Sequence, residues 1–506
     1  MSLGQKKTES LFTENVVAVQ DEPDDFVLLK VENRKAAERR VVRRLDMRLT
    51  LTVAVIYVMN YIDRVAVTAA RLQGLEADLG LSDVEYETVI AVLFASYSPA
   101  QIPSNMILAH ISRPSFYIGA CVMAWGLTSA LTGVTKNFSG IVACRIFIGL
   151  PEAAFYPGSM YLLSRWYTRG ELALRSAAFF VGLIISNAFG SLIAAGILGN
   201  FQGKLGIAAW RWLFYIEGAV TMFIGLLAMW LLPDLPHNTR WMSPAERRLV
   251  QVRLVEDVGE ADKDCSEATI LDGFKLAIRD VKVWIFMLMC CSQILGLSFI
   301  NFFPTLTATL GYNTTDTLLL AAPPWVFASI CCIINAWNCD RTGERYFHMA
   351  AWWWVTIVGY IIALATMSTG ARYFSLFLMS SGLCGSALIL NWVSNTIPRP
   401  PAKRAVAIGL VNGMGNLGGL MGSYIWKARW GPAYKQSMLI ALCSLVLSSI
   451  LGMVMRQMLI HENKQWEREA QEFTQGQRER IEEAARLEGI SFEEAVRRRR
   501  GFHYLY

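Results

Sequence analysis

Twelve runs of about 20 mainly apolar residues follow one another along this chain of 506 residues, separated by short polar segments. A helix needs a run of that length to cross the hydrocarbon core of a bilayer, where its backbone polar groups must bond within the segment. Because 54% of the residues are hydrophobic and only 17% are charged, an ordinary soluble domain is excluded. The sequence therefore predicts an all-α membrane protein with twelve transmembrane helices. The predicted spans are 49–70, 87–107, 116–134, 139–163, 174–198, 210–232, 281–303, 318–338, 347–367, 373–395, 404–426 and 436–459.

A weak internal repeat divides the spans into two related halves. Arg175 opens the fifth span and Arg404 opens the eleventh, and twelve residues later each is followed by Asn-x-x-Gly, at Asn187 and Asn416. Two six-helix bundles related by an axis along the membrane normal are the architecture that such a repeat implies. The predicted parts are an N-terminal segment 1–48, a bundle 49–232, a central loop 233–280, a second bundle 281–459 and a tail 460–506.

Lysine and arginine placement predicts the orientation. Segments 1–48 and 233–280 both carry an excess of these residues, which marks them and both termini as cytoplasmic. The net charge of +6 is thus a topology signal and not a nucleic-acid footprint. Asn137 and Asn313 begin glycosylation sequons on the predicted outer side, although their loops are short for occupancy. We expect a multi-pass protein of the plasma membrane.

Four charged residues lie inside apolar runs: Asp63, Arg64, Arg145 and Glu152. A charge at bilayer depth costs several kcal/mol unless it is paired or faces water, so such residues are functional candidates. Two arginines and two carboxylates are also the parts needed to hold an anion and to move a proton. Arg145 and Glu152 are seven residues apart and therefore share a helix face, about 10 Å apart along the axis.

A structural reading of the same four residues stays open. Asp63 would pair with Arg145, and Arg64 would extend to the outer headgroups. We favour function because intramembrane charge is costly. Uncharged candidates for the substrate site are Tyr156 and Trp392, which suit stacking on a flat ligand, and Asn301; their alternative roles are packing and helix association.

The turn after the eighth span reads Asp340-Arg341-Thr342-Gly343-Glu344-Arg345 and fits D-R-x-G-x-R. Asp340, Arg341 and Arg345 there are predicted gating residues that lock neighbouring helix ends, with ordinary positive-inside charge as the alternative. The chain has no phosphate loop, no His-Glu-x-x-His and only five histidines. We therefore expect no enzyme activity, no cofactor and no metal site, with energy drawn from an ion gradient.

These motifs together resemble the major facilitator superfamily. Asp63-Arg64, Arg145-x6-Glu152 and the stretch 210–218 resemble its anion:cation symporter branch, and within it the fungal allantoate permease-like group. The resemblance implies that Arg64 and Arg145 contact a substrate carboxylate, and that Asp63 and Glu152 couple protons. In the first half, residues 110–114 replace the Asp-Arg-x-Gly-Arg of the superfamily, so only the second-half gate is carried over.

The predicted function is secondary active transport by alternating access, as proton-coupled symport of a small organic anion such as a carboxylate or vitamin-like molecule. Two alternatives are export of a secondary metabolite beside a biosynthetic gene cluster, and a nutrient sensor that does not transport. The predicted partners are the organic anion, protons and the lipid bilayer, without nucleic acid, and we expect the monomer to be functional.

Overall fold

Short polar segments between the apolar runs start several of the helices. Ser82 accepts a hydrogen bond from the Glu85 backbone at 3.4 Å, and the Glu85 carboxylate accepts one from the Ser82 backbone at 2.8 Å. This reciprocal capping satisfies N–H groups that a helix start leaves free. Asn137, the first sequon residue, caps its helix in a similar way by accepting from Gly140 N at 2.9 Å. The helix boundaries thus follow from local chemistry.

The computed structural model describes residues 31–236, 238–259, 270–342, 344–386, 388–397 and 401–471, and parts of the predicted N-terminal segment, central loop and tail lie outside them. The described residues form helices, turns and loops without a strand, which confirms the predicted all-α fold class. In this part of the chain nine helical runs have the length and apolar composition needed to cross a membrane. Helix α5, the pair α7 and α8, and helix α20 occupy the three other predicted spans.

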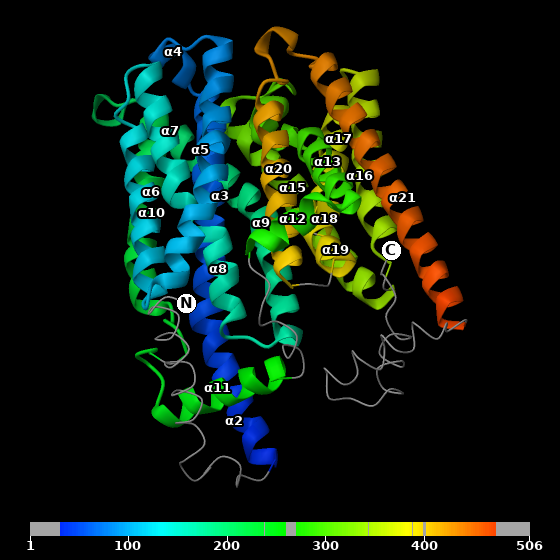
Figure 1. The fold of residues 1–506 in the computed structure, drawn as a ribbon. Helices are drawn as coiled ribbons and strands as arrows, with labels where there is room; N and C mark the ends of the chain where they lie inside the picture. Colours follow the sequence, from blue (N-terminus) through cyan, green and yellow to red (C-terminus); the bar gives the residue numbers. More distant parts are fainter. Residues whose placement is uncertain are drawn as a thin grey trace.

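The first half of the chain, blue to green on the left of Figure 1, forms one helical bundle. Its helices are α2 (Val31–Leu45), a π-helical turn (Asp46–Thr50), α3 (Leu51–Arg71), α4 (Leu75–Leu79), α5 (Asp83–His110), α6 (Pro114–Thr132), α7 (Phe138–Glu152), α8 (Phe155–Ser164), α9 (Arg169–Asn200) and α10 (Ala209–Leu231). Helix α6 packs along α10, α3 along α9 and α5 along α7. The first predicted span is therefore the C-terminal part of a longer helical run that begins at Val31.

The second half forms the other bundle, green to orange on the right of Figure 1. Its helices are α13 (Val281–Gly296), a 3₁₀ turn (Ser298–Phe302), α14 (Phe303–Ala308), α15 (Thr314–Thr342), α16 (Tyr346–Ala365), α17 (Thr369–Ser380), α18 (Leu383–Ser386), α19 (Ile389–Thr396), α20 (Pro401–Ser423) and α21 (Lys435–Gln471). Helix α13 packs against α20 and α21, and α16 against α17. Across the two bundles, α9 contacts α15 and α5 contacts α20.

Small residues bring backbones together inside each bundle. A Cβ added to Gly218 of α10 would lie 2.5 Å from the backbone N of Ala130 in α6. In the second bundle, a Cβ on Gly385 of α18 would lie 2.5 Å from the Met349 carbonyl of α16. Helix association in lipid depends on such close approach because the hydrophobic effect does not drive it there. The glycines thus fix the helix neighbours within each half.

The segment expected as a central polar loop contains two helices, α11 (Pro244–Gly259) and α12 (Ile270–Ile278). Arg44 of α2 pairs with Glu246 of α11 at 2.7 Å, and Arg253 of α11 donates to the Trp166 carbonyl at 3.0 Å. Helices α2 and α11 and the end of α21 lie at one end of the molecule, opposite α4 (Figure 1). This arrangement gathers the basic segments at one end of the bundles.

Candidate functional site

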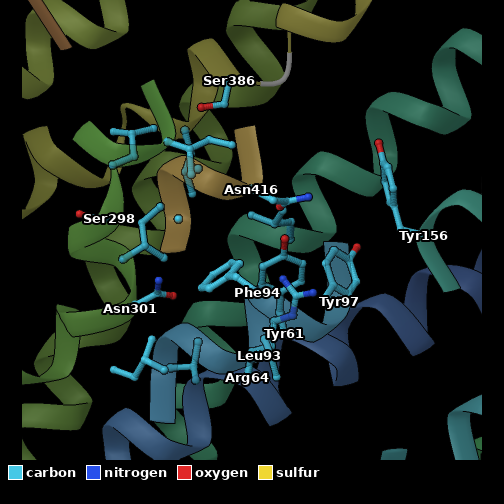
Figure 2. Close-up of a pocket in the computed structure, with 18 of the residues that line it drawn as sticks. Tyr61, Arg64, Leu93, Phe94, Tyr97, Tyr156, Ser298, Asn301, Ser386 and Asn416 are labelled. Carbon is cyan, nitrogen blue, oxygen red and sulfur yellow. The ribbon is translucent and has the colours of Figure 1, made fainter. Parts of the chain in front are cut away.

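A cavity of about 250 Å³ lies between the two bundles and is lined by residues of both. The first bundle contributes Tyr61, Arg64, Phe94, Tyr97, Arg145 and Tyr156 among others, and the second contributes Gln293, Ser298, Asn301, Ser386, Asn412 and Asn416. Figure 2 shows the aromatic and cationic groups on one side and the neutral polar groups of the second bundle on the other. Four of the predicted substrate residues therefore meet in one place: Arg64, Arg145, Tyr156 and Asn301.

Arg64 pairs with Glu152 at the edge of this cavity. Its Nε donates a hydrogen bond to Oε1 of the glutamate, and the exposed fraction of the carboxylate side chain is only 2%. The guanidinium also lies over two rings, 4.6 Å from the centre of Tyr97 and 5.3 Å from that of Tyr61. Arg64 is thus held by its own bundle and does not extend toward headgroups. The second carboxylate oxygen of Glu152 is buried without a hydrogen-bond partner.

Arg145 is the second cationic residue that lines the cavity, and it is not paired. Its side chain is 2% exposed, yet its Nε and Nη2 make no hydrogen bond in the structure. A buried guanidinium nitrogen without a partner is costly, because its desolvation is not offset. Since Arg145 lines the cavity, an anion placed there would satisfy these donors. The planar guanidinium suits a carboxylate because it binds both oxygens at once.

Asp63 faces away from the cavity, although it precedes Arg64 in the sequence. Its carboxylate accepts hydrogen bonds from Ser129 Oγ at 3.2 Å and from Thr221 Oγ1 at 3.0 Å. These donors belong to α6 and α10, on the other side of α3. Successive helix residues diverge by about 100°, which separates the two neighbours. The Asp63–Arg145 pair of the structural reading is therefore not formed.

A break in the fourth predicted span places Glu152 at a helix end. Helix α7 stops at Glu152 and α8 begins at Phe155. The residue at 157 is proline, which has no N–H to donate to the carbonyl four residues earlier, so the helix cannot continue regularly through this point. Glu152 thus lies where the helix is interrupted, beside Arg64.

The remaining predicted residues have other surroundings. Trp392 is fully buried, with its ring 5.2 Å from Phe286 and 6.5 Å from Tyr346, and it is not among the described residues that line the cavity. Asn313 Oδ1 accepts from the backbone N of Asp316 at 2.8 Å at the start of α15, so both sequon asparagines are helix caps. Trp392 has the position of a packing residue.

The predicted gate lies at the end of α15. Arg341 is exposed and lies over the Trp337 ring at 5.6 Å, and Arg345 donates to Cys339 Sγ at 3.1 Å. The side chain of Asp340 lies outside the described residues. Between the two arginines, Glu344 pairs with Arg456 of α21 at 3.1 Å. The turn is therefore tied to α21 through Glu344, which was not among the predicted gating residues.

Several cavity residues were missed from the sequence. Tyr61, Tyr97 and Phe94 are aromatic residues in apolar spans, where nothing in the pattern separates a binding role from packing. Asn416 had a usable signal, because it begins the second copy of the repeated Asn-x-x-Gly. Its counterpart Asn187 donates to the Leu183 carbonyl at 3.0 Å within α9, whereas Asn416 lines the cavity.

On the side of α4, helix α5 joins the two bundles. The Asp83 carboxylate accepts from the backbone N of Ala428 at 2.9 and 3.0 Å, and Thr88 bonds to Tyr424 at 3.3 Å. Arg71 lies beside Asp83 at 3.6 Å. The contacts of Asp83 and Thr88 join the two bundles near the start of α5.

A family model described as Major Facilitator Superfamily matches residues 53–423. Among curated proteins, the MFS-type transporter cnsO of Penicillium expansum is 30% identical over 475 residues, which cover 91% of each chain. A putative tartrate transporter of Agrobacterium vitis is 28% identical and covers 83% of this chain and 95% of that protein. Among solved structures, a bacterial homologue of the human lysosomal transporter Spinster, inward-facing and unoccupied, superposes with a TM-score of 0.63 at 17% identity, over 81% of this chain and 96% of that one.

Proposed function

The chain belongs to the Major Facilitator Superfamily and is a multi-pass membrane transporter, and from this premise we propose that it carries a small organic anion together with a proton. One observation carries the proposal. Two arginines line the central cavity: Arg145, which is buried and unpaired, and Arg64, whose ion-pair partner Glu152 is not itself among the described lining residues. Arg145 suits an anion, and the pair of Arg64 with Glu152 suits a proton switch.

Arg145 is the proposed anchor of the anion. Its unbonded nitrogens are donors in a poorly hydrated site, where a charge-assisted hydrogen bond is stronger than in water. A neutral sugar would leave the guanidinium charge uncompensated, whereas a carboxylate neutralises it. A tartrate transporter among the relatives supports an organic anion as substrate, because tartrate is a carboxylate.

Glu152 is the proposed proton carrier. While its carboxylate is charged it forms an ion pair with Arg64, and the two are hydrogen-bonded in the structure. Protonation removes that charge, which releases Arg64 and leaves its guanidinium free to face the anion. Anion and proton would then bind cooperatively, since each offsets the charge change caused by the other. Asp63 holds α3 against α6 and α10 in this scheme, and its own part in proton coupling stays a prediction.

Alternating access would move the bundles against each other around this cavity, as is general for transporters built from two repeats. The contacts of Asp83 and Thr88 with the second bundle would open when the cavity turns to the α4 side. The gating roles of Asp340, Arg341 and Arg345 remain part of this proposal. So do a plasma-membrane location and cytoplasmic termini, which the basic helices α2 and α11 at one end support.

The test is uptake of labelled small carboxylates by cells that express the chain, in acidic and in neutral medium. We expect the unmodified chain to take up the carboxylate faster in acidic medium than in neutral medium. The Glu152→Gln variant should take it up at the same rate in both media. Glu217→Gln is the matched control, because Glu217 is a buried carboxylate of the same bundle that, unlike Glu152, does not pair with a cavity arginine in the described structure. Equal uptake in both media by the unmodified chain would overturn proton coupling.

The same site serves either direction of net flux, because alternating access is reversible. Export of a metabolite therefore remains the second candidate, and a deletion strain that retains a carboxylate inside the cell would favour it over uptake.

A further inference from the structure

The two sides of the cavity offer a ligand different chemistry. On the first bundle, Arg145 has two buried donors without a partner. On the second bundle, Asn416 has one, because its Nδ2 is buried and makes no hydrogen bond. Figure 2 shows the Asn416 side chain at the cavity, together with other neutral groups of the second bundle that include Asn301 and Ser298. A ligand that satisfies both ends would bridge the bundles.

Three other polar residues of the second bundle that line the cavity already make hydrogen bonds. Gln293 donates to Ser386 at 2.5 Å, and Ser298 accepts from Trp426 at 2.9 Å. Asn412 donates to Gln101 of α5 at 3.4 Å. Among the described lining residues of the second bundle, Asn416 has the one side-chain donor that is fully buried and has no partner. An amide N–H calls for an acceptor oxygen or nitrogen.

No described lining residue of the second bundle is charged, whereas the first bundle supplies both arginines. Arg64 is in turn neutralised by Glu152 while that carboxylate is charged. A second carboxylate at the far end of the ligand would therefore be buried without a cation. Burial of an unpaired charge is strongly unfavourable. The far end of the ligand must be neutral.

Flat aromatic surface lies between the two ends. The Tyr61 and Tyr97 rings both lie against the Arg64 guanidinium, and Phe94 lines the cavity next to them in Figure 2. Aromatic rings favour flat partners, which stack or meet edge to face with them. At about 250 Å³ the cavity is also smaller than the roughly 300–1,000 Å³ typical of drug-sized ligands.

We infer that the substrate is a compact planar monocarboxylate with a neutral hydrogen-bond acceptor at the end opposite the carboxylate. The carboxylate binds Arg145, the ring lies among Tyr61, Tyr97 and Phe94, and the acceptor receives the Asn416 hydrogen bond. This inference rests on the proposed function, since it takes Arg145 as the anion site and narrows the class of anion.

The experiment measures binding by calorimetry to the full chain in lipid nanodiscs at neutral pH, without an ion gradient. Four probes share one benzene ring: 4-carbamoylbenzoate, benzoate, terephthalate and benzamide. We expect 4-carbamoylbenzoate to bind about fivefold to tenfold more tightly than benzoate, as one hydrogen bond predicts. Terephthalate should bind more weakly than either, and benzamide should not bind detectably.

Two substitutions test the neutral end of the proposed site. Asn416→Leu should remove the advantage of 4-carbamoylbenzoate over benzoate and leave benzoate binding unchanged within about twofold. Asn301→Arg places a cation on the second bundle and should make terephthalate the preferred probe, with Asn301→Gln as the neutral control. Because a misfolded variant can only lose binding, a gain of terephthalate binding cannot result from misfolding.

Tighter binding of terephthalate than of 4-carbamoylbenzoate to the unmodified chain would overturn the inference, as would binding of benzamide as tight as that of benzoate. If none of the four probes binds while cells take up an aliphatic anion in a proton-dependent way, the inference fails and the proposed function stands. If no anion is taken up at all, the proposed function fails with it.

Discussion

Arg64 and Glu152 are hydrogen-bonded inside the first bundle, although 88 positions separate them in the sequence. The pair joins the C-terminal half of α3 to the point where α7 ends. Its carboxylate is almost fully buried and its guanidinium partly so, with side-chain exposures of 2% and 15%. The geometry makes each residue the compensating charge of the other, and four predictions follow from this site and its surroundings.

Removing one partner of the pair should destabilise the protein more than removing both. Arg64→Met or Glu152→Met leaves one buried charge without its partner, a cost of about 3–5 kcal/mol in buried pairs. The double variant leaves none, so its stability should lie much closer to that of the unmodified chain. Thermal unfolding of the four proteins in one detergent measures this, and a double variant as unstable as the sum of the single ones would contradict it.

Arg145→Gln should weaken binding of a carboxylate substrate by roughly 10- to 100-fold, since hydrogen bonds to charged groups contribute about 1.5–3 kcal/mol. It should not lower the melting temperature much, because the free protein has no hydrogen bond at Nε or Nη2 to lose. Arg145→Lys is the matched control that keeps the charge without the planar fork, and an intermediate affinity is expected. Unchanged affinity in Arg145→Gln, measured by calorimetry, would remove this residue from the site.

Asp63→Asn should affect stability rather than substrate affinity. Both oxygens of Asp63 accept hydrogen bonds, from Ser129 and Thr221, whereas the amide keeps only one acceptor. We expect a lower melting temperature and a substrate affinity within about twofold of the unmodified protein. Ser129→Ala should cause a smaller loss, because it removes one bond only. A large loss of affinity with normal stability would instead place Asp63 in ligand binding.

Asp83→Ala should favour the conformation in which the cavity opens on the α4 side. The change removes both hydrogen bonds to Ala428 that join the two bundles near the start of α5. A cysteine placed at Asn301 reports the opening, because it lines the cavity and would react faster with an impermeant thiol reagent added to intact cells. Labelling of the chain without that cysteine gives the background.

Glu85→Gln is the control for this comparison. It alters a carboxylate two residues away that caps α5 through Ser82, and glutamine serves the same capping position. It should leave labelling at position 301 unchanged. Equal labelling in Asp83→Ala and Glu85→Gln would show that the Asp83 contact does not hold this end closed.

Prediction from the sequence worked best where one local rule acts alone. The length of the apolar runs predicted the all-α membrane fold, and each predicted span falls on a helix or on consecutive helices. The predicted span 139–163 is two helices, because proline breaks the hydrogen-bond ladder that run length alone would continue. The expected central loop contains α11, which is too polar to resemble a span, and α12, which is apolar but only 9 residues long.

Part of the candidate site could likewise be predicted from the sequence, and part could not. The cost of charge in lipid singled out Arg64, Arg145 and Glu152, and the structure brings all three to one region. The cost of burial does not say which way a side chain points, so Asp63 was grouped with them although it faces α6 and α10. Trp392 and Tyr156 looked alike as aromatic residues in spans, but only Tyr156 lines the cavity among the described residues.

By itself the sequence determined that this chain spans a membrane as helices, and which of its charges are too costly to lie there without a purpose. Those properties depend on the residues of each segment and on the lipid around it, so the amino-acid sequence is enough to predict them. Only the tertiary structure decided that Arg64 pairs with Glu152, that Arg145 is left unpaired and that Asn416 of the other bundle lines the same cavity. Partners are set by how helices from distant segments pack and rotate, and no spacing within one helix encodes that.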